Sequence, residues 1–374
     1  MTRARAPEPP PEPPGRSPSA TPPRPRGFDE ARAAVGAATS AAELLGTEPV
    51  AAARRHRHLI RLLHPDTAPP GRAAEATAAC AALNALNAAR GAVAPPAGTV
   101  TTPHHRYTTA DLQASGDLAV LRRARAAPHR DPYTERDVVL KIPRSPADND
   151  LIAREATALN RLARHGDPRF HAYAPTLIET FRYTDPADRG SRAVRQVNAI
   201  QRLDGFRPLT DLATARPEGV DARDAAWIWR RLLVALGYAH RAGVRHGAVL
   251  PEHIMIHPES HGVVLVDWCY SVTGDHAPLP ALVERHRDRY PPEVLAREPA
   301  TEATDIHLSS LCMAELMGDR APLALRAFVV GSTLADERRR PHDAWRLLAE
   351  FDDLLDRLYG PRTFRPLHLP NLPN

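Results

Sequence analysis

The sequence predicts a protein of several domains, in which a small all-α module precedes an α+β domain. Two observations predict this order. An alanine-rich stretch with helical spacing fills residues 28–93. Further along, the segment from Arg245 to Trp268 has two apolar runs, Ile254–Ile256 and Val263–Val266, around a turn-like PESHG, a pattern typical of a β-hairpin. This hairpin begins in a histidine-rich loop and ends at Asp267, so we expect polar side chains at its ends to converge on a ligand site.

Length and composition limit the function classes. A chain of 374 residues with 43% hydrophobic residues has room for two or three domains, while 39 prolines are too many for one globule. The net charge of +5 is modest, so nucleic-acid binding is not indicated. The three cysteines form no CxxC pair, which suits a reducing compartment and argues against structural zinc. No apolar run reaches about 18 residues and no signal-peptide core is present, so we expect a cytoplasmic protein without a membrane partner.

The N-terminal quarter is predicted to hold a proline-rich arm and three helices. Residues 1–27 contain ten prolines, a composition typical of a disordered or polyproline-like arm. One short helix closes at the glycine of AAELLG, a second begins near Pro49, and a third runs from about Arg72 to Arg90. We expect the second helix to expose its basic residues, which are Arg54, Arg55, Arg57, His58 and Arg61.

A basic helix, an HPD loop and a return helix, in this order, resemble the J-domain of DnaJ-type co-chaperones. The resemblance rests on ELLG and His64-Pro65-Asp66 at their separation in residues 28–93, which is fairly specific. It implies that His64, Pro65 and Asp66 trigger ATP hydrolysis by a DnaK-type chaperone ATPase, and that the basic residues form the electrostatic contact, namely Arg54, Arg55, Arg57 and Arg61. The alternative is a three-helix module with a solvated basic face. No Gly/Phe-rich linker or zinc-binding region follows, so a complete DnaJ-type chaperone is not expected.

A second observation concerns lysine. The chain has 49 basic residues, and only Lys141, at the end of the run VVLK, is a lysine. Composition alone would predict arginine there too. The position therefore favours a compact ammonium on a flexible stem over a planar guanidinium.

The run VVLK resembles the VAIK strand of protein kinases, whose lysine reaches the ATP phosphates. His246 to His253 resembles the catalytic loop, and Asp267-Trp268-Cys269 stands where that family has its metal-binding DFG triplet, at the family's spacing. The resemblance covers residues 106–359 and implies a bilobal protein-kinase-like fold, with a small lobe over about 106–200 and a large lobe over about 206–359. Residues 94–105 are predicted to be a linker, and residues 360–374 a proline-rich tail.

The kinase resemblance implies an ATP site. Glu155, fourteen residues after Lys141 on a predicted amphipathic helix, would pair with that lysine. Gly116 is the one family glycine present in the phosphate-covering loop, and backbone groups near Gln201 to Leu203 would meet the adenine.

Metal binding is implied for Asp267 and His253. Asp267 matches the family's metal-binding aspartate, and His253 replaces its second metal ligand, an asparagine. Because hard Mg²⁺ prefers oxygen ligands, an imidazole at this place suits Mn²⁺ better.

The catalytic loop departs from the family's HRD…N pattern. His246 is present, but Gly247 replaces the arginine, Ala248 the catalytic aspartate, and Leu250 a lysine toward the γ-phosphate. A positioned general base contributes roughly 10²–10⁴ in rate, so its loss at Ala248 argues against efficient phosphoryl transfer, and no catalytic residue is assigned. His246 and Glu252 are the candidate substitutes.

The remaining landmarks are structural or regulatory. An apolar helix over Ala225 to Ala242 is expected to bury Trp227, Leu232, Leu233 and Leu236. Glu293 is expected to pair with Arg340, and Asp305 to support the fold. In the activation-segment position, the candidates for modification are Ser271 and Thr273.

The sequence therefore predicts a J-like module fused to a pseudokinase, an intracellular co-chaperone or adaptor that binds ATP. The alternative is an atypical Ser/Thr kinase with a rearranged catalytic loop. A chain that only scaffolds would leave the single lysine unexplained. Neither a client nor a substrate can be named from the sequence.

Overall fold

The computed structural model describes residues 25–38, 41–46, 49–63, 68–69, 71–90, 98–131, 134–184, 193–274 and 277–367. The chain divides into two compact units, residues 1–93 and 94–374. Most of the predicted proline-rich arm, the motif His64-Pro65-Asp66 and the end of the predicted tail lie outside the described residues.

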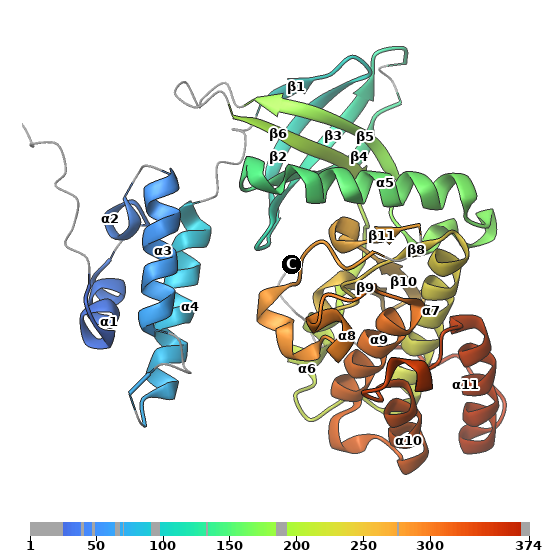
Figure 1. Cartoon of the computed structure of the whole chain (residues 1–374). Coiled ribbons are helices and arrows are strands. Elements are labelled where there is room, and N and C mark those ends of the chain that lie inside the picture. Colours follow the sequence, from blue (N-terminus) through green and yellow to red (C-terminus); the bar gives the residue numbers. More distant parts are fainter. Residues whose placement is uncertain are drawn as a thin grey trace, which may run out of the picture. The chain divides into compact units, whose positions relative to one another are not determined.

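The first unit consists of four described helices, shown in blue tones in Figure 1. They are α1 (Phe28–Ala37), α2 (Ala41–Leu45), α3 (Pro49–Leu63) and α4 (Ala73–Arg90). The three predicted helices are confirmed as α2, α3 and α4, and α1 is an additional one. Apolar residues from all four helices form one core, among them Val35, Leu45, Leu59, Leu63 and Leu83. Gly46 ends α2 with a φ of 83°, a backbone conformation that a glycine adopts without strain.

The prediction that Arg55 is exposed is wrong. Arg55 is only 7% exposed. It lies three residues after Ala52 and four before Leu59, which are both fully buried, so helical spacing places it on the apolar stripe of α3. Arg54 and Arg61 are exposed as expected, while the side chain of Arg57 lies outside the described part of the chain.

The second unit begins with a curled antiparallel sheet of six strands (Figure 1). The strands are β1 (Thr99–Thr101), β2 (His105–Ser115), β3 (Ala119–Pro128), β4 (Arg136–Pro143), β5 (Leu177–Thr184) and β6 (Val194–Gln201). Their order across the sheet is β1-β2-β3-β4-β6-β5. Helix α5 (Asn149–His165) packs against β6 and β5 with its apolar side, which includes Ile152 and Leu159.

The predicted linker over residues 94–105 is too long. Thr99 to Thr101 pairs with Arg106 to Thr108 as strand β1, so the sheet begins within that range. Two β-branched threonines around a valine favour an extended strand, and a partly buried hydrogen bond from Thr102 to Glu179 ties this stretch to β5.

The rest of the second unit is mainly helical. Its longer helices are α6 (Leu209–Ala215), α7 (Ala222–Arg241), α9 (Glu302–Met317), α10 (Leu323–Ser332) and α11 (Ala344–Tyr359), with the short α8 at Pro292–Leu295. Three further strands are short, namely β7 (Arg207–Pro208), β8 (Val244–Arg245) and β11 (Val272–Thr273). β7 pairs with one strand of the predicted hairpin, and β8 pairs with β11. This hairpin is confirmed as β9 (Ile254–His257) and β10 (Gly262–Leu265), paired antiparallel.

Helix α7 provides the centre of the larger core. Leu232, Leu233 and Leu236 are fully buried as predicted. Trp227 is only partly buried, because it faces the turn between β9 and β10 and stacks on His261 with ring centroids 4.0 Å apart. The fully buried tryptophan of this helix is Trp229, two residues later.

The second unit is therefore a mixed α/β structure with an antiparallel sheet. Among the described helices, none combines the length and the apolar character that a membrane crossing needs.

Candidate functional site

Lys141 lies in β4 and points to two carboxylates from other elements. Its Nζ donates to Glu155 Oε1 at 2.9 Å and to Asp267 Oδ1 at 2.6 Å. The predicted pair with Glu155 is therefore confirmed. Lys141 is 4% and Glu155 1% exposed. Burial alone would lower the pKa of Lys141, but the neighbouring carboxylates, Asp267 foremost, raise it well above its ordinary value.

Glu155 is held from a second side by Asn198. The Asn198 amide donates to Glu155 Oε2 and to the Ile152 carbonyl, both at 2.9 Å. Asn198 is fully buried in β6 and lies directly opposite Lys141 in the strand register. It was not among the residues predicted from the sequence. A polar residue inside the otherwise apolar stretch VNAI is the signal that could have found it.

Asp267 follows β10 in a left-handed backbone conformation, with φ 65° and ψ 58°. This conformation is uncommon for a residue with a side chain. Its Oδ1 accepts from Lys141, and its Oδ2 lies 3.3 Å from His253 Nε2. Burial alone would raise the pKa of Asp267, but the charge of Lys141 and the contact with His253 hold it well below its ordinary value.

His253 ends the short helical turn Pro251–His253 and is oriented by the loop before it. Its Nδ1 donates to the Ala248 carbonyl at 2.8 Å, which leaves Nε2 facing Asp267. Burial alone would lower the pKa of His253, but the Asp267 carboxylate raises it.

His246 is buried, and both of its ring nitrogens have partners. Nε2 donates to the Val266 carbonyl at 3.0 Å, and Nδ1 accepts from the Ala248 amide at 3.3 Å. Burial lowers the pKa of His246 to about 4, so the ring is neutral near pH 7. A ring engaged in this way has no nitrogen free to take a substrate proton.

Asp305 fixes the start of the same loop, as predicted for a structural residue. Its carboxylate accepts from the backbone amides of His246 and Gly247, each at 2.8 Å, and from His240 Nε2 at 3.0 Å. The other predicted structural pair is also confirmed, since Arg340 donates to Glu293 at 2.5 Å.

Gly247 has a φ of 74°, and its neighbours explain why no larger residue stands there. A Cβ at this position would lie 2.6 Å from the Tyr270 carbonyl oxygen and 2.6 Å from Leu279. An arginine at this place would adopt a backbone conformation that is strained for a residue with a side chain. It would also displace the backbone of Tyr270.

The position expected to carry a general base is apolar. Ala248 is fully buried in a cluster with Leu250, Cys269, Tyr270 and residues from the sheet and α5. Glu252, the other candidate base, pairs with Arg285 at 2.6 Å and with His286 at 2.8 Å. Burial alone would raise the pKa of Glu252, but the hydrogen bond from His286 and the charge of His253 lower it to about 2.

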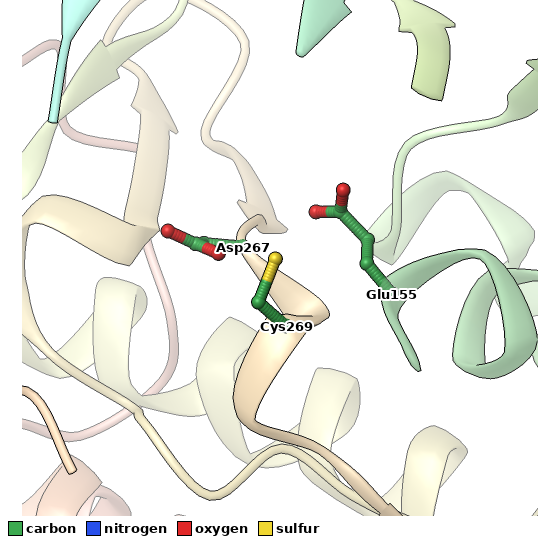
Figure 2. Close-up of side chains that lie close together, drawn as sticks. All are labelled: Glu155, Asp267 and Cys269. Atoms are coloured by element: carbon green, nitrogen blue, oxygen red, sulfur yellow. The ribbon is translucent and has the colours of Figure 1, made fainter. Parts of the chain in front are cut away.

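One trio of side chains brings metal-ligating atoms together. Ligand atoms of Glu155, Asp267 and Cys269 lie within 4.8 Å of one another, and Figure 2 shows Glu155 pointing from α5 toward the other two. The trio does not fit a metal ion. The Lys141 ammonium already bonds both carboxylates, and burial raises the pKa of the Cys269 thiol well above its ordinary value, so no thiolate is available.

Asp267 and His253, the predicted metal ligands, are brought together by the structure. Oδ2 and Nε2 face each other at 3.3 Å, and a backbone carbonyl fixes the other ring nitrogen. Because Asp267 raises the pKa of His253, this contact is a charge-assisted hydrogen bond, and a metal ion would have to displace the proton on Nε2.

The other predicted ligand residues lie apart from this group. Gly116 is in the exposed turn between β2 and β3, where its carbonyl accepts from Arg144 Nε at 2.6 Å. Gln201 ends β6, and its backbone amide donates to the Thr176 carbonyl at 2.9 Å, so this amide has a partner. Leu203 lies in the partly exposed turn that follows.

Two further findings concern residues near the site. Of the two candidates for modification, Ser271 is fully buried, which argues against it, and Thr273 is partly buried in β11. Arg285 pairs with Asp117 of the β2–β3 turn and with Glu252. No sequence pattern singled out Arg285, an arginine among many.

No protein-family model matches this chain, and no curated protein matches it either. Its function is therefore argued from the geometry of the site.

Proposed function

We propose that this chain is a pseudokinase fused to a J-like module, which binds ATP without transferring its phosphoryl group and acts as an intracellular co-chaperone or adaptor. The observation that carries the proposal is the contrast within one site. Lys141 is held by both Glu155 and Asp267, while the place of the base is the buried Ala248.

The buried ion network supports a role in ligand binding. Removing two carboxylates and an ammonium from water is costly, and a well-packed apolar cluster would be at least as stable. A fold therefore gains no stability from placing its single lysine there. In a bilobal kinase-like arrangement, this ammonium would meet the phosphates of a nucleotide.

Asp267 and His253 would hold a divalent ion together with the nucleotide. Such an ion would neutralise phosphate charge when bound. The chain's own residues then orient the ligand: Asn198 and Glu155 fix the position of the ammonium, and the Ala248 carbonyl fixes the imidazole.

The proposed absence of phosphoryl transfer is supported at the three positions where a base was sought. The Ala248 side chain has no acceptor, both ring nitrogens of His246 are hydrogen-bonded, and Glu252 is paired with Arg285 and His286. An atypical kinase would need a base from elsewhere.

The J-like module would contact a DnaK-type ATPase through α3. Arg54 and Arg61 are exposed on this helix and can supply the electrostatic contact. The client would be a protein that the second unit recruits.

A thermal-shift titration of the full chain with ATP tests the proposal. ATP alone, ATP with Mg²⁺ and ATP with Mn²⁺ are compared. ATP at about 100 times its Kd should stabilise the protein by about 2.7 kcal/mol. Lys141→Arg keeps the charge but not the shape, and we expect it to abolish the shift.

The matched control is Arg287→Gln, since Arg287 is exposed and pairs only locally with Glu284. This variant should respond to ATP as the wild type does. Absence of any shift at millimolar ATP, with folded wild-type protein, would contradict the proposal.

A further inference from the structure

The groups proposed to meet a nucleotide are buried in the described arrangement. Lys141, Glu155 and His253 are 4%, 1% and 6% exposed, and only Asp267 is partly exposed. A ligand the size of a nucleotide cannot reach the Lys141 ammonium without separating elements that now cover it. The site is therefore closed.

We propose that Arg285 is the latch that holds this site closed, and that a polyphosphate ligand enters when Arg285 releases the turn between β2 and β3. The inference rests on the proposed function for its ligand, and it adds how access to the site is controlled.

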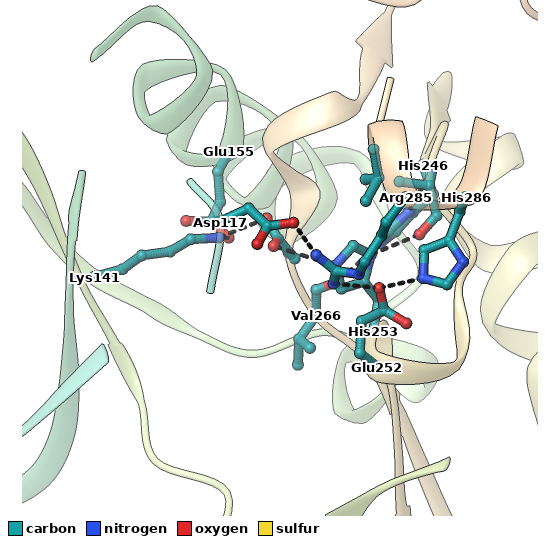
Figure 3. Close-up of polar contacts among 12 residues, drawn as sticks. Asp117, Lys141, Glu155, His246, Glu252, His253, Val266, Arg285 and His286 are labelled. Carbon is teal, nitrogen blue, oxygen red and sulfur yellow. Dashed lines mark hydrogen bonds and ion pairs between the residues drawn. The ribbon is translucent and has the colours of Figure 1, made fainter. Parts of the chain in front are cut away.

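The polar part of the latch is one guanidinium between two elements. Arg285 pairs with Asp117 of the β2–β3 turn through Nη1, and its Nη2 donates to Glu252 Oε1 at 2.6 Å. His286 binds the same Glu252 oxygen at 2.8 Å and steadies it (Figure 3). Residues far apart in the sequence are thereby joined, and Glu252 among them directly precedes His253 of the site.

The apolar part of the latch lies beside Asp117. Leu118 and Ala119 belong to one cluster with Ala248 and Leu250 of the loop and with Tyr270 and Val283 beyond Asp267. Ala119 is 5% exposed. The turn thus packs on the loop where the base is expected, and this packing hides the site from solvent.

The turn is fixed firmly to the sheet, so opening would occur on the Arg285 side. Arg144 of the sheet side donates through Nε to the Gly116 carbonyl at 2.6 Å, and its backbone amide donates to Leu118 at 2.9 Å. These bonds move with the sheet. Release therefore needs only the separation of Asp117 and the apolar contacts from the helical part.

The polar contacts are weak enough to be released by a ligand. The side chains of Arg285 and Asp117 are 45% and 73% exposed, and exposed ion pairs contribute little to stability. A polyphosphate then enters those molecules in which the pair of Arg285 with Asp117 is broken, and its binding favours the open arrangement. Ligand binding and opening are then coupled, because ATP affinity rises with the fraction of open protein.

Two variants of the full chain test the latch. Arg285→Gln removes both ion pairs, whereas Asp117→Asn removes only the one to the turn. Arg287→Gln is the matched control, an exposed arginine two residues away with a local partner. Hydrogen exchange without nucleotide is measured for the amides of residues 116–119 and 246–253, and ATP affinity by titration.

We expect faster exchange in both segments for Arg285→Gln, a smaller increase for Asp117→Asn and none for the control. ATP affinity should rise about two- to five-fold in Arg285→Gln, in step with the open fraction. Unchanged exchange in both variants would overturn the latch, and so would a fall in ATP affinity in both, because Arg285 would then belong to the ligand's own contacts. If ATP binds none of the proteins, the proposed function fails, while the exchange data still decide the latch.

Discussion

Two neighbouring parts of the site differ in chemistry. Around Lys141, polar groups are buried and nearly all bonded, with Glu155, Asp267 and Asn198 in direct contact. Around Ala248, the loop is buried among apolar side chains, including Leu250. We propose that the first part holds a charged ligand, whereas the side chains of Ala248 and Leu250 in the second part accept no proton.

A phosphoryl-transfer enzyme needs groups that orient the phosphates and a group that takes a proton, and in this chain the two requirements fall on different parts of the site. Orientation of phosphates needs cations and their partners, and proton transfer needs a base with a matched pKa. In this chain the Lys141 ammonium has its carboxylate partners, while both ring nitrogens of His246 are hydrogen-bonded and Glu252 is paired with Arg285 and His286. The function that we propose, binding without transfer, rests on that combination.

The largest effect is expected from removing the ammonium. Lys141→Met leaves the buried Glu155 and the partly exposed Asp267 without their shared cation. Breaking a buried pair in this way typically costs about 3–5 kcal/mol. Urea unfolding of the second unit should show a loss of this size. The control Arg287→Ala should change stability by less than about 0.5 kcal/mol, because its pair is exposed. A small loss in Lys141→Met would mean that the network is not buried in solution.

A second variant tests the apolar part. Ala248→Asp restores the carboxylate expected of a base, but it does so in a fully buried apolar cluster. Burial of an unpaired polar group costs roughly 1–3 kcal/mol, and more if it is charged. We therefore expect a less stable protein that still transfers no phosphoryl group to itself or to generic acceptors.

Radiolabelled ATP is the measurement for transfer, with Ala248→Asp combined with His253→Asn as the strongest attempt at restoration. Robust transfer by the unmodified protein, lost in Asp267→Asn, would contradict the proposal that the chain binds ATP without transferring its phosphoryl group. A base from another residue would then have to exist.

Sequence alone predicted those elements that follow from regular spacing. The segment with Glu155 has the spacing of an amphipathic helix, and the hairpin from Ile254 to Leu265 has an apolar run on each side of a turn. Such patterns are local, so they can be recognised before the fold is known. The pairs of Lys141 with Glu155 and of Glu293 with Arg340 came from the kinase resemblance instead.

The unpredicted contacts have no local pattern. Arg285 meets Asp117 across 168 residues, and nothing near either residue marks it. Asn198 acts only because the strand register places it opposite Lys141. Arg55 was predicted to be exposed because its charge was given more weight than its position on the helix. An arginine can occupy the apolar side of a helix, because its long aliphatic stem can be buried there.

Acid should destabilise the protein through His246. Its pKa is about 4 in the folded state, below the ordinary 6.5, so the unfolded chain takes up a proton first as the pH falls. Its contribution to stability is therefore lost progressively between pH 6.5 and about 4, by about 3 kcal/mol in total. His253 has the opposite sign. Its raised pKa adds stability below pH 6.5 that is lost as the pH rises through the folded value.

The opposite pKa shifts of the two histidines are checked by NMR titration of their imidazole rings, with unfolding measured over the same pH range. His246 should remain neutral down to pH 5, while His253 stays protonated above pH 6.5. Titration of both rings near pH 6.5 would show that neither is buried as described. His165→Gln, at an exposed histidine, is the control for the unfolding curves.

The smallest effect is expected in the first unit, where a buried and an exposed arginine are neighbours on one helix. Arg55 is buried on α3 and Arg54 is exposed beside it. Arg55→Ala should destabilise the module by about 1 kcal/mol through lost packing, and Arg54→Ala should change its stability by less than about 0.5 kcal/mol. Stimulation of a DnaK-type ATPase should show the reverse order, because only an exposed arginine can contact a partner. If Arg54→Ala and Arg61→Ala leave stimulation unchanged while His64→Gln removes it, the electrostatic contact lies elsewhere on the module. If the intact chain never stimulates the ATPase, the first unit is a helical module with a solvated basic face.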